Sequence, residues 1–187
     1  MNAPSSPDLA VPVTSSDHVS GPPDAAVTVV EYGDFECPTC KLAYPSVKLL
    51  LKHFGPQVRF AYRHFPLEQP HPHALLAAEA AESAAAQGRF WEMHDLLFDN
   101  QPRLEKNHLG DYAQRIQLDL PRFTTELDTH VHVDRVRADL ASGTKSHVRS
   151  TPGFFVNGRI VDVSFGMRAL FDATEAALRS RQALPVE

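Results

Sequence analysis

Cysteine is scarce in this chain, which has only Cys37 and Cys40 among its 187 residues. No apolar run approaches the roughly 20 residues needed to cross a bilayer, so we expect no membrane span. Lys and Arg are scattered and the net charge is −5, whereas nucleic-acid binding needs a concentrated basic surface. These absences argue against a membrane-spanning protein and against nucleic acid as the main partner.

The beginning of the sequence lacks the features of a secretory leader. Residues 1–24 contain neither a basic start nor an apolar stretch, so we expect a cytoplasmic protein, or a periplasmic one if a leader has been removed. Pro, Ser and Asp are frequent there, which predicts a disordered arm over residues 1–16. Because structural disulfides are rare in the cytoplasm, a C-x-x-C pair is more often redox-active or metal-binding in that compartment.

Apolar spacing predicts a strand, a helix and a second strand near the start of the domain. Residues 27–32 are a short run of β-forming residues, and residues 58–65 alternate apolar and polar side chains. Between them, apolar residues recur at helical spacing from Ala43 to Phe54, with Pro45 inside the helix. A strand–helix–strand order favours a parallel pair with a right-handed crossover.

The middle of the chain, residues 71–147, is almost entirely helical in pattern. Its first segment, residues 74–88, is rich in alanine, which favours helix and close packing. Further short amphipathic segments follow up to about residue 147.

The last part of the chain predicts two strands and a helix. Residues 154–161 are two apolar runs around Asn157-Gly158, the dipeptide typical of a type I′ hairpin, and an amphipathic helix follows. The whole order predicts a thioredoxin-like α/β fold with a helical insertion. We expect one domain over residues 17–183, with thioredoxin-like parts at about 17–70 and 148–183.

Both cysteines are expected at the mouth of the first helix. If the helix starts after the strand, Cys37 lies beside its N-cap and Pro38 takes the first helical position. Cys40 then lies in the same turn, because residues three apart share a face. Unpaired N–H groups and the helix dipole stabilise a thiolate there, which lowers a thiol pKa. This geometry makes Cys37 the nucleophile and Cys40 the resolving thiol.

A metal site is the alternative use of a C-x-x-C pair. A structural zinc site needs four ligands, and the sequence holds no second cysteine pair. His71 and His73 are the candidates to complete it, but histidines in a Pro-rich loop are ordinarily solvated. A C-x-x-C directly after a strand favours redox chemistry, so we expect neither a metal nor a cofactor.

Several segments together resemble the DsbA-like branch of the thioredoxin superfamily over residues 18 to 180. They are VTVVEY followed by GDFECPTC, the FPL segment, the Ala-rich helix leading to QGRFWEMHDLLF, and STPGFFVNG. The resemblance implies a thiol–disulfide oxidoreductase with a groove for extended polypeptide. Its partners would be polypeptides with thiols or disulfides, attacked through a mixed disulfide at Cys37 that Cys40 resolves, and an unidentified redox partner.

The resemblance also implies roles for five residues. Cys37 looks like the exposed attacking cysteine, Cys40 its buried partner and Pro152 the cis-proline. Thr151 would offer its backbone to a bound peptide and its hydroxyl near Cys37. Glu31 is similar to the buried acid behind the motif and would shuttle a proton for Cys40. From the residues alone, a trans Pro152 and a solvated Glu31 stay open.

The central dipeptide departs from the pattern of strongly oxidising relatives, because it is Pro38-Thr39 rather than Pro-His. Thr39 cannot become cationic, so it adds no charge that stabilises the Cys37 thiolate. Asp34 and Glu36 add negative charge nearby, which raises a thiol pKa, and a less stabilised thiolate makes a less oxidising disulfide. A cytosolic reductase or isomerase is therefore one alternative, and a peptide-holding module with an incidental disulfide is another.

Overall fold

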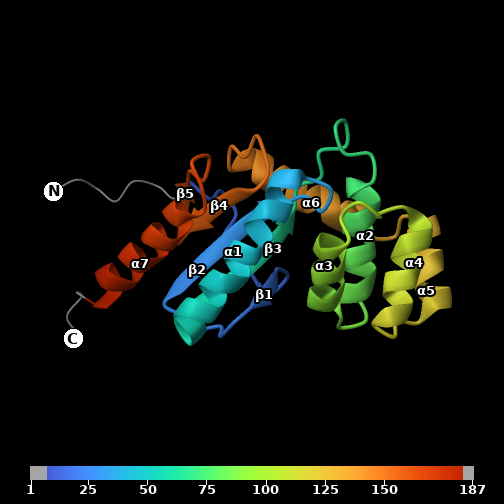
Figure 1. Cartoon of the computed structure of the whole chain (residues 1–187), viewed down its shortest axis with the longest axis horizontal. Coiled ribbons are helices and arrows are strands. Elements are labelled where there is room, and N and C mark those ends of the chain that lie inside the picture. Colours follow the sequence, from blue (N-terminus) through green and yellow to red (C-terminus); the bar gives the residue numbers. More distant parts are fainter. Residues whose placement is uncertain (1–7, 183–187) are drawn as a thin grey trace. The chain divides into compact units, whose positions relative to one another are not determined.

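The computed structural model describes residues 8–182, with five strands and seven α-helices (Figure 1). The strands are β1 (His18–Ser20), β2 (Val27–Gly33), β3 (Val58–His64), β4 (Gly153–Val156) and β5 (Arg159–Val161). The helices are α1 (Pro38–Phe54), α2 (Ala74–Ala85), α3 (Phe90–Asp99), α4 (Lys106–Arg115), α5 (Leu120–Asp128), α6 (Val133–Lys145) and α7 (Arg168–Gln182), and a 3₁₀ turn covers Gly55–Gln57. The predicted thioredoxin-like α/β fold with a helical insertion is confirmed.

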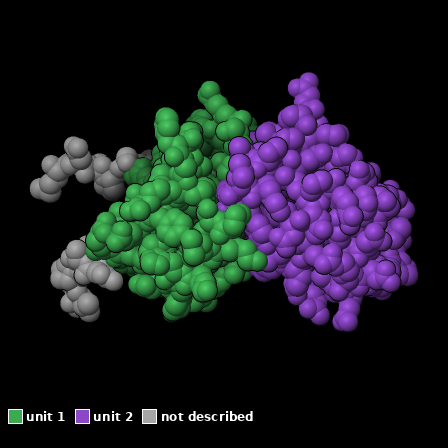
Figure 2. All heavy atoms as spheres, in the orientation of Figure 1, with its two compact units in different colours: residues 1–32, 45–63, 142–187 green, residues 33–44, 64–141 purple. Residues whose placement is uncertain are grey.

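Two compact units divide the chain (Figure 2). Among the described residues, unit 1 comprises 8–32, 45–63 and 142–182, and unit 2 comprises 33–44 and 64–141. Unit 1 contains nearly all of the sheet together with α7. Unit 2 contains the cysteine motif and the helices from α2 to most of α6, so the block of helices predicted at 71–147 shares its unit with the two thiols.

The sheet of unit 1 has the strand order β1-β3-β2-β4-β5. β1 pairs antiparallel with β3, and β4 pairs antiparallel with both β2 and β5. The predicted hairpin is confirmed: Asn157 and Gly158 join β4 to β5 with φ of 46° and 79°, the left-handed values that a type I′ turn needs. The short strand β1 was not predicted, since three residues carry no readable alternation.

The arm at the start of the chain differs from its prediction. Residues 1–7 lie outside the described residues, but residues 8–16 are not disordered: Leu9 is buried and its N–H donates to Gly158 O at 3.0 Å. The cause is Arg63, whose buried guanidinium donates to Val11 O, at 2.8 Å, and to the Asp17 carboxylate, at 2.6 Å. A buried charge needs such partners, and the arm supplies them.

Unit 2 is built around α2, which contacts α3, α4 and α5. Alanines of α2 such as Ala77, Ala80, Ala81 and Ala84 are fully buried. Their small side chains let the neighbouring helices approach closely, which is the packing that the Ala-rich segment predicted.

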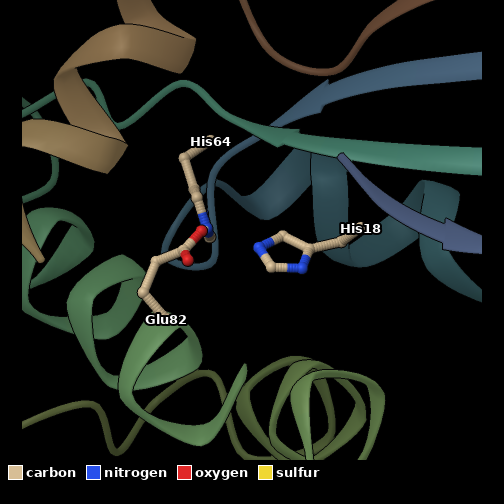
Figure 3. A group of neighbouring side chains, drawn as sticks. All are labelled: His18, His64 and Glu82. Atoms are coloured by element: carbon tan, nitrogen blue, oxygen red, sulfur yellow. The ribbon is translucent and has the colours of Figure 1, made fainter. Parts of the chain in front are cut away.

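A buried polar network joins the end of β3 to α2 and α6 within unit 2. The His64 imidazole bonds to the Glu82 carboxylate at 2.9 Å (Figure 3), and the His64 N–H donates to Asp139 at 3.0 Å. Arg135 donates in turn to Asp139. Buried polar groups must find partners of this kind, so His64 is a structural residue, in agreement with the sequence interpretation.

Glu126 on α5 fastens three segments of unit 2 together. Its carboxylate accepts hydrogen bonds from the Ser83 hydroxyl at 2.6 Å and from the Arg122 guanidinium at 2.7 Å. It also forms a hydrogen bond with the His132 ring at 2.9 Å. Burial opposes ionisation of Glu126, but the hydrogen bonds from Ser83, His132 and Arg122 outweigh it and lower the pKa of the carboxyl to about 2.

We predict that Glu126→Gln destabilises the protein by on the order of 2 kcal/mol at neutral pH. Because the folded-state pKa is depressed, this stabilisation is present above the unfolded-state pKa and is lost as pH falls towards 2. The free-energy difference between the two proteins should therefore shrink between about pH 5 and pH 2. Urea unfolding followed by circular dichroism across that range measures it, and a difference that does not change with pH would contradict this account.

Candidate active site

Residues 33–40, here called the CPTC turn, connect β2 to α1 within unit 2. The Cys37 N–H donates to Asp34 O at 3.2 Å, and Cys37 O accepts from the Lys41 N–H at 3.1 Å. Cys37 thus provides the carbonyl of the first helical hydrogen bond, and Pro38 is the first helical residue. The predicted position of Cys37 at the helix N-terminus is confirmed.

Both cysteines are largely buried. Cys40 is fully buried, in agreement with its expected role, but Cys37 is only 6% exposed. The expectation of an exposed attacking cysteine is therefore corrected: Cys37 is buried as a residue, while Pro38 and Thr39 are exposed.

Thr39 contributes more to the site than its lack of charge suggested. Its hydroxyl oxygen lies 3.0 Å from the Cys37 sulfur. A hydroxyl at that distance donates to a thiolate, and a hydrogen bond to the charged form favours that form. Thr39 is therefore placed to donate a hydrogen bond to a Cys37 thiolate, a contact that the sequence interpretation did not include.

The two acids of the turn are paired with the histidines that sequence reasoning considered solvated. Asp34 Oδ2 lies 2.7 Å from His71 Nδ1, and Glu36 Oε1 lies 2.9 Å from His73 Nδ1. The His71 side chain is only 14% exposed. A protonated histidine in such a pair would offset the negative charge of its acid, which would weaken the expected opposition of Asp34 and Glu36 to the Cys37 thiolate.

Burial raises the pKa of the Asp34 carboxyl above its ordinary value. Hydrogen bonds from the Leu67 N–H, the His71 ring and the Glu36 N–H act in the opposite direction but do not cancel it. This carboxyl is the most enclosed charged group of the turn, with no side-chain exposure.

Gln101 binds the turn from another part of unit 2, and the Phe35 ring of the turn packs against α3. Gln101 Nε2 donates to Phe35 O at 2.8 Å and to Cys37 O at 2.9 Å. The Phe35 ring packs against Phe98, at 5.0 Å between centroids, and against His94, at 5.7 Å. Sequence reasoning missed Gln101, because nothing local marks a residue 64 positions away as a partner of the Cys37 carbonyl.

The other predicted site residues belong to unit 1. The Thr151–Pro152 peptide bond is cis, and Thr151 is buried. Glu31 lies on β2 opposite Phe154 of β4 and is 3% exposed, so the solvated alternative is excluded. The approach of Thr151 to Cys37, and proton transfer between Glu31 and Cys40, stay predictions.

The family model described as thioredoxin matches residues 13–173. BdbD from Bacillus subtilis superposes with a TM-score of 0.77 and 27% identity, over 87% of this chain and 91% of that one. A thioredoxin-like oxidoreductase from Silicibacter pomeroyi gives 0.78 and 27%, over 91% and 95%. The chain belongs to the DsbA-like branch of the thioredoxin superfamily. Wolbachia pipientis α-DsbA1, 18% identical over 94% of this chain and 96% of that one, shares the fold with a TM-score of 0.75.

The chain spans about a quarter of the length of the curated relatives that it matches. One relative is a Salinispora arenicola protein named Na⁺/H⁺ antiporter NhaA 1, to which the chain is 48% identical over 179 residues. The matched region covers 95% of this chain and 27% of that protein. Another is a Herminiimonas arsenicoxydans protein named Na⁺/H⁺ antiporter NhaA, to which the chain is 44% identical over 163 residues. The matched region covers 87% of this chain and 26% of that protein. The transport activity is that of the longer, whole proteins.

Among the described residues, the cysteines lie in no cluster of candidate metal ligands, and no helix is suited to cross a membrane. Within unit 2, neither cysteine lies in a group of three candidate metal ligands; His71 and His73, the histidines considered for such a site, are paired with acids instead. Across residues 8–182, no helix combines the length and the apolar character that a membrane span requires.

We predict that Thr39→Val moves the pH midpoint of Cys37 alkylation upwards by about half a unit to one unit, because the thiolate loses a hydrogen bond. Thr39→Ser keeps the hydroxyl and should behave like the parent protein. Iodoacetamide labelling between pH 4 and pH 8, with the site identified by mass spectrometry, measures both variants. An unchanged midpoint in the Val variant would show that the hydroxyl does not act on the thiolate.

Proposed function

We propose that this protein is a thiol–disulfide oxidoreductase that acts on protein or peptide disulfides. The observation that carries the proposal is the position of Cys37 at the N-terminus of α1, with Cys40 in the same turn. The helix terminus and the Thr39 hydroxyl favour the Cys37 thiolate, which is the attacking species in disulfide exchange.

The reaction proceeds in two exchange steps. When the Cys37–Cys40 dithiol reduces a client, the Cys37 thiolate attacks one sulfur of the client disulfide, and the other client sulfur leaves as a thiolate. Cys40 then loses its proton and attacks the Cys37 sulfur, which releases the second client thiolate and forms the Cys37–Cys40 disulfide. Two electrons pass from the dithiol to the client, and the reverse sequence oxidises a client dithiol.

Residues of unit 1 complete the proposal. The buried Glu31 takes up or returns the proton of Cys40, and Thr151 and Pro152 present the backbone to an extended client. Support for client binding comes from a cavity of about 350 Å³ within unit 1, whose apolar lining includes Val148, Pro152 and Ile160. The Ile160 side chain, 55% exposed, offers apolar surface to a polypeptide.

Two alternative functions predict different experimental results. A cytosolic reductase or isomerase uses the same two thiols, and equilibration of the Cys37–Cys40 pair with glutathione buffers separates it from an oxidase by its reduction potential. A peptide-holding module would protect an aggregating client equally well after both cysteines are changed to Ser.

We predict that Cys40→Ser accumulates mixed disulfides with client peptides, because the resolving thiol is absent, whereas Cys37→Ser forms none. Non-reducing gels and mass spectrometry of the trapped species measure the two variants side by side. Trapping at Cys40 in the Cys37→Ser protein would reverse the assigned roles, and absence of any trapped species would reject the proposed function.

We predict that Ile160→Asp lowers the rate of exchange with a peptide disulfide by about tenfold, since it places a charge in the apolar lining. Its rate with glutathione disulfide, which is too small to need this surface, should change by less than about twofold. Leu49→Asp is the matched control, because Leu49 is 59% exposed on α1 outside the cavity. Equal losses with both substrates would argue against a client surface here.

A further inference from the structure

The peptide group between Gly33 and Asp34 points its N–H at the buried resolving thiol. The Asp34 N–H lies 3.5 Å from the Cys40 sulfur, within hydrogen-bond distance for sulfur. On the other side of the same planar group, Gly33 O accepts from the Phe65 N–H at 2.8 Å. The plane of this peptide is thus fixed from both sides within unit 2.

A donor at this place matters because Cys40 has no exposed surface. In both directions of the proposed reaction Cys40 passes through a thiolate, either as the attacking group or as the leaving group. Burial disfavours that charge, and a hydrogen bond to it acts in the opposite direction. The Asp34 amide therefore faces the sulfur on which the resolution step creates charge.

The Asp34 side chain locks the orientation of its own backbone. Its carboxylate accepts from the Glu36 N–H at 2.8 Å, which closes a local turn, and from the Leu67 N–H at 2.9 Å. The His71 ring binds the same carboxylate at 2.7 Å. These contacts tie the residue that faces Cys40 to the segment before α2.

We propose that Asp34 is a positioning residue for Cys40: its carboxylate holds the Gly33–Asp34 peptide so that its N–H stabilises the Cys40 thiolate during resolution. This inference rests on the proposed function. It gives each sulfur a donor of its own, because the Cys37 sulfur lies against the Thr39 hydroxyl, whereas Asp34 O and Gln101 bind the Cys37 backbone.

The different donors at the two sulfurs make the proposal testable with glutathione disulfide. The Cys37 thiolate attacks it, forming the Cys37–glutathione disulfide and one glutathione thiolate. Cys40 then releases its proton and displaces the second glutathione, leaving the Cys37–Cys40 disulfide. Acid quenching and mass spectrometry resolve the three protein species over time, which gives a rate for attack and a rate for resolution.

Asp34→Ala should slow resolution by about tenfold, the size expected when a charged group loses a well-placed donor, and should change the attack rate by less than about twofold. Asp34→Asn, which keeps one acceptor oxygen, should lie between. Glu36→Gln is the matched control, since this neighbouring acid binds His73 instead, and its resolution rate should stay within about twofold of the parent rate.

Equal slowing of attack and resolution in the Asp34 variants would overturn the proposal, because it would indicate a general disturbance of the turn. Unchanged resolution would overturn it as well, and so would equal slowing by Glu36→Gln. If Asp34→Ala does not fold, the comparison of Asp34→Asn with Glu36→Gln decides. A parent protein that never forms the mixed disulfide would instead reject the proposed function itself.

Discussion

Burial of an ionised side chain is costly unless hydrogen-bond partners replace the lost water, and this constraint shapes both units of the structure. In unit 1 the Arg63 guanidinium draws the arm at residues 11–17 onto itself. In unit 2 the Asp34 carboxylate gathers N–H groups from the CPTC turn and from the segment before α2. The buried Arg63 and Asp34 side chains therefore each hold together segments that are far apart in the sequence.

The same constraint separates what the sequence could predict from what it could not. Apart from β1, the strands, the helices and the Asn157-Gly158 hairpin follow from local spacing and turn chemistry, so the sequence predicted them. The place of Cys37 before the first helical residue also follows locally, from Pro38 at the start of α1. In each case a regular spacing of apolar residues, or a short sequence motif, is enough to predict the element.

Long-range partners contain no such signal. Arg63 and Asp17 are 46 positions apart, and Gln101 is 64 positions from Cys37. His71 is an ordinary loop histidine until its ring is seen beside a buried carboxylate 37 positions earlier. The isomer of the Thr151–Pro152 bond is equally invisible in the residues alone, and only the resemblance to the family suggested it. Such contacts require the folded chain.

Within the C-P-T-C motif, Pro38 and Thr39 are exposed while both cysteines are buried. A macromolecule that approached the motif would therefore meet the Pro38 ring and the Thr39 side chain over a larger surface than either cysteine. Under the proposed function, these two side chains would shape the surface that a partner meets beside Cys37. A substitution at position 38 would then change that surface, whereas one at position 39 would change both the surface and the contact with the Cys37 sulfur.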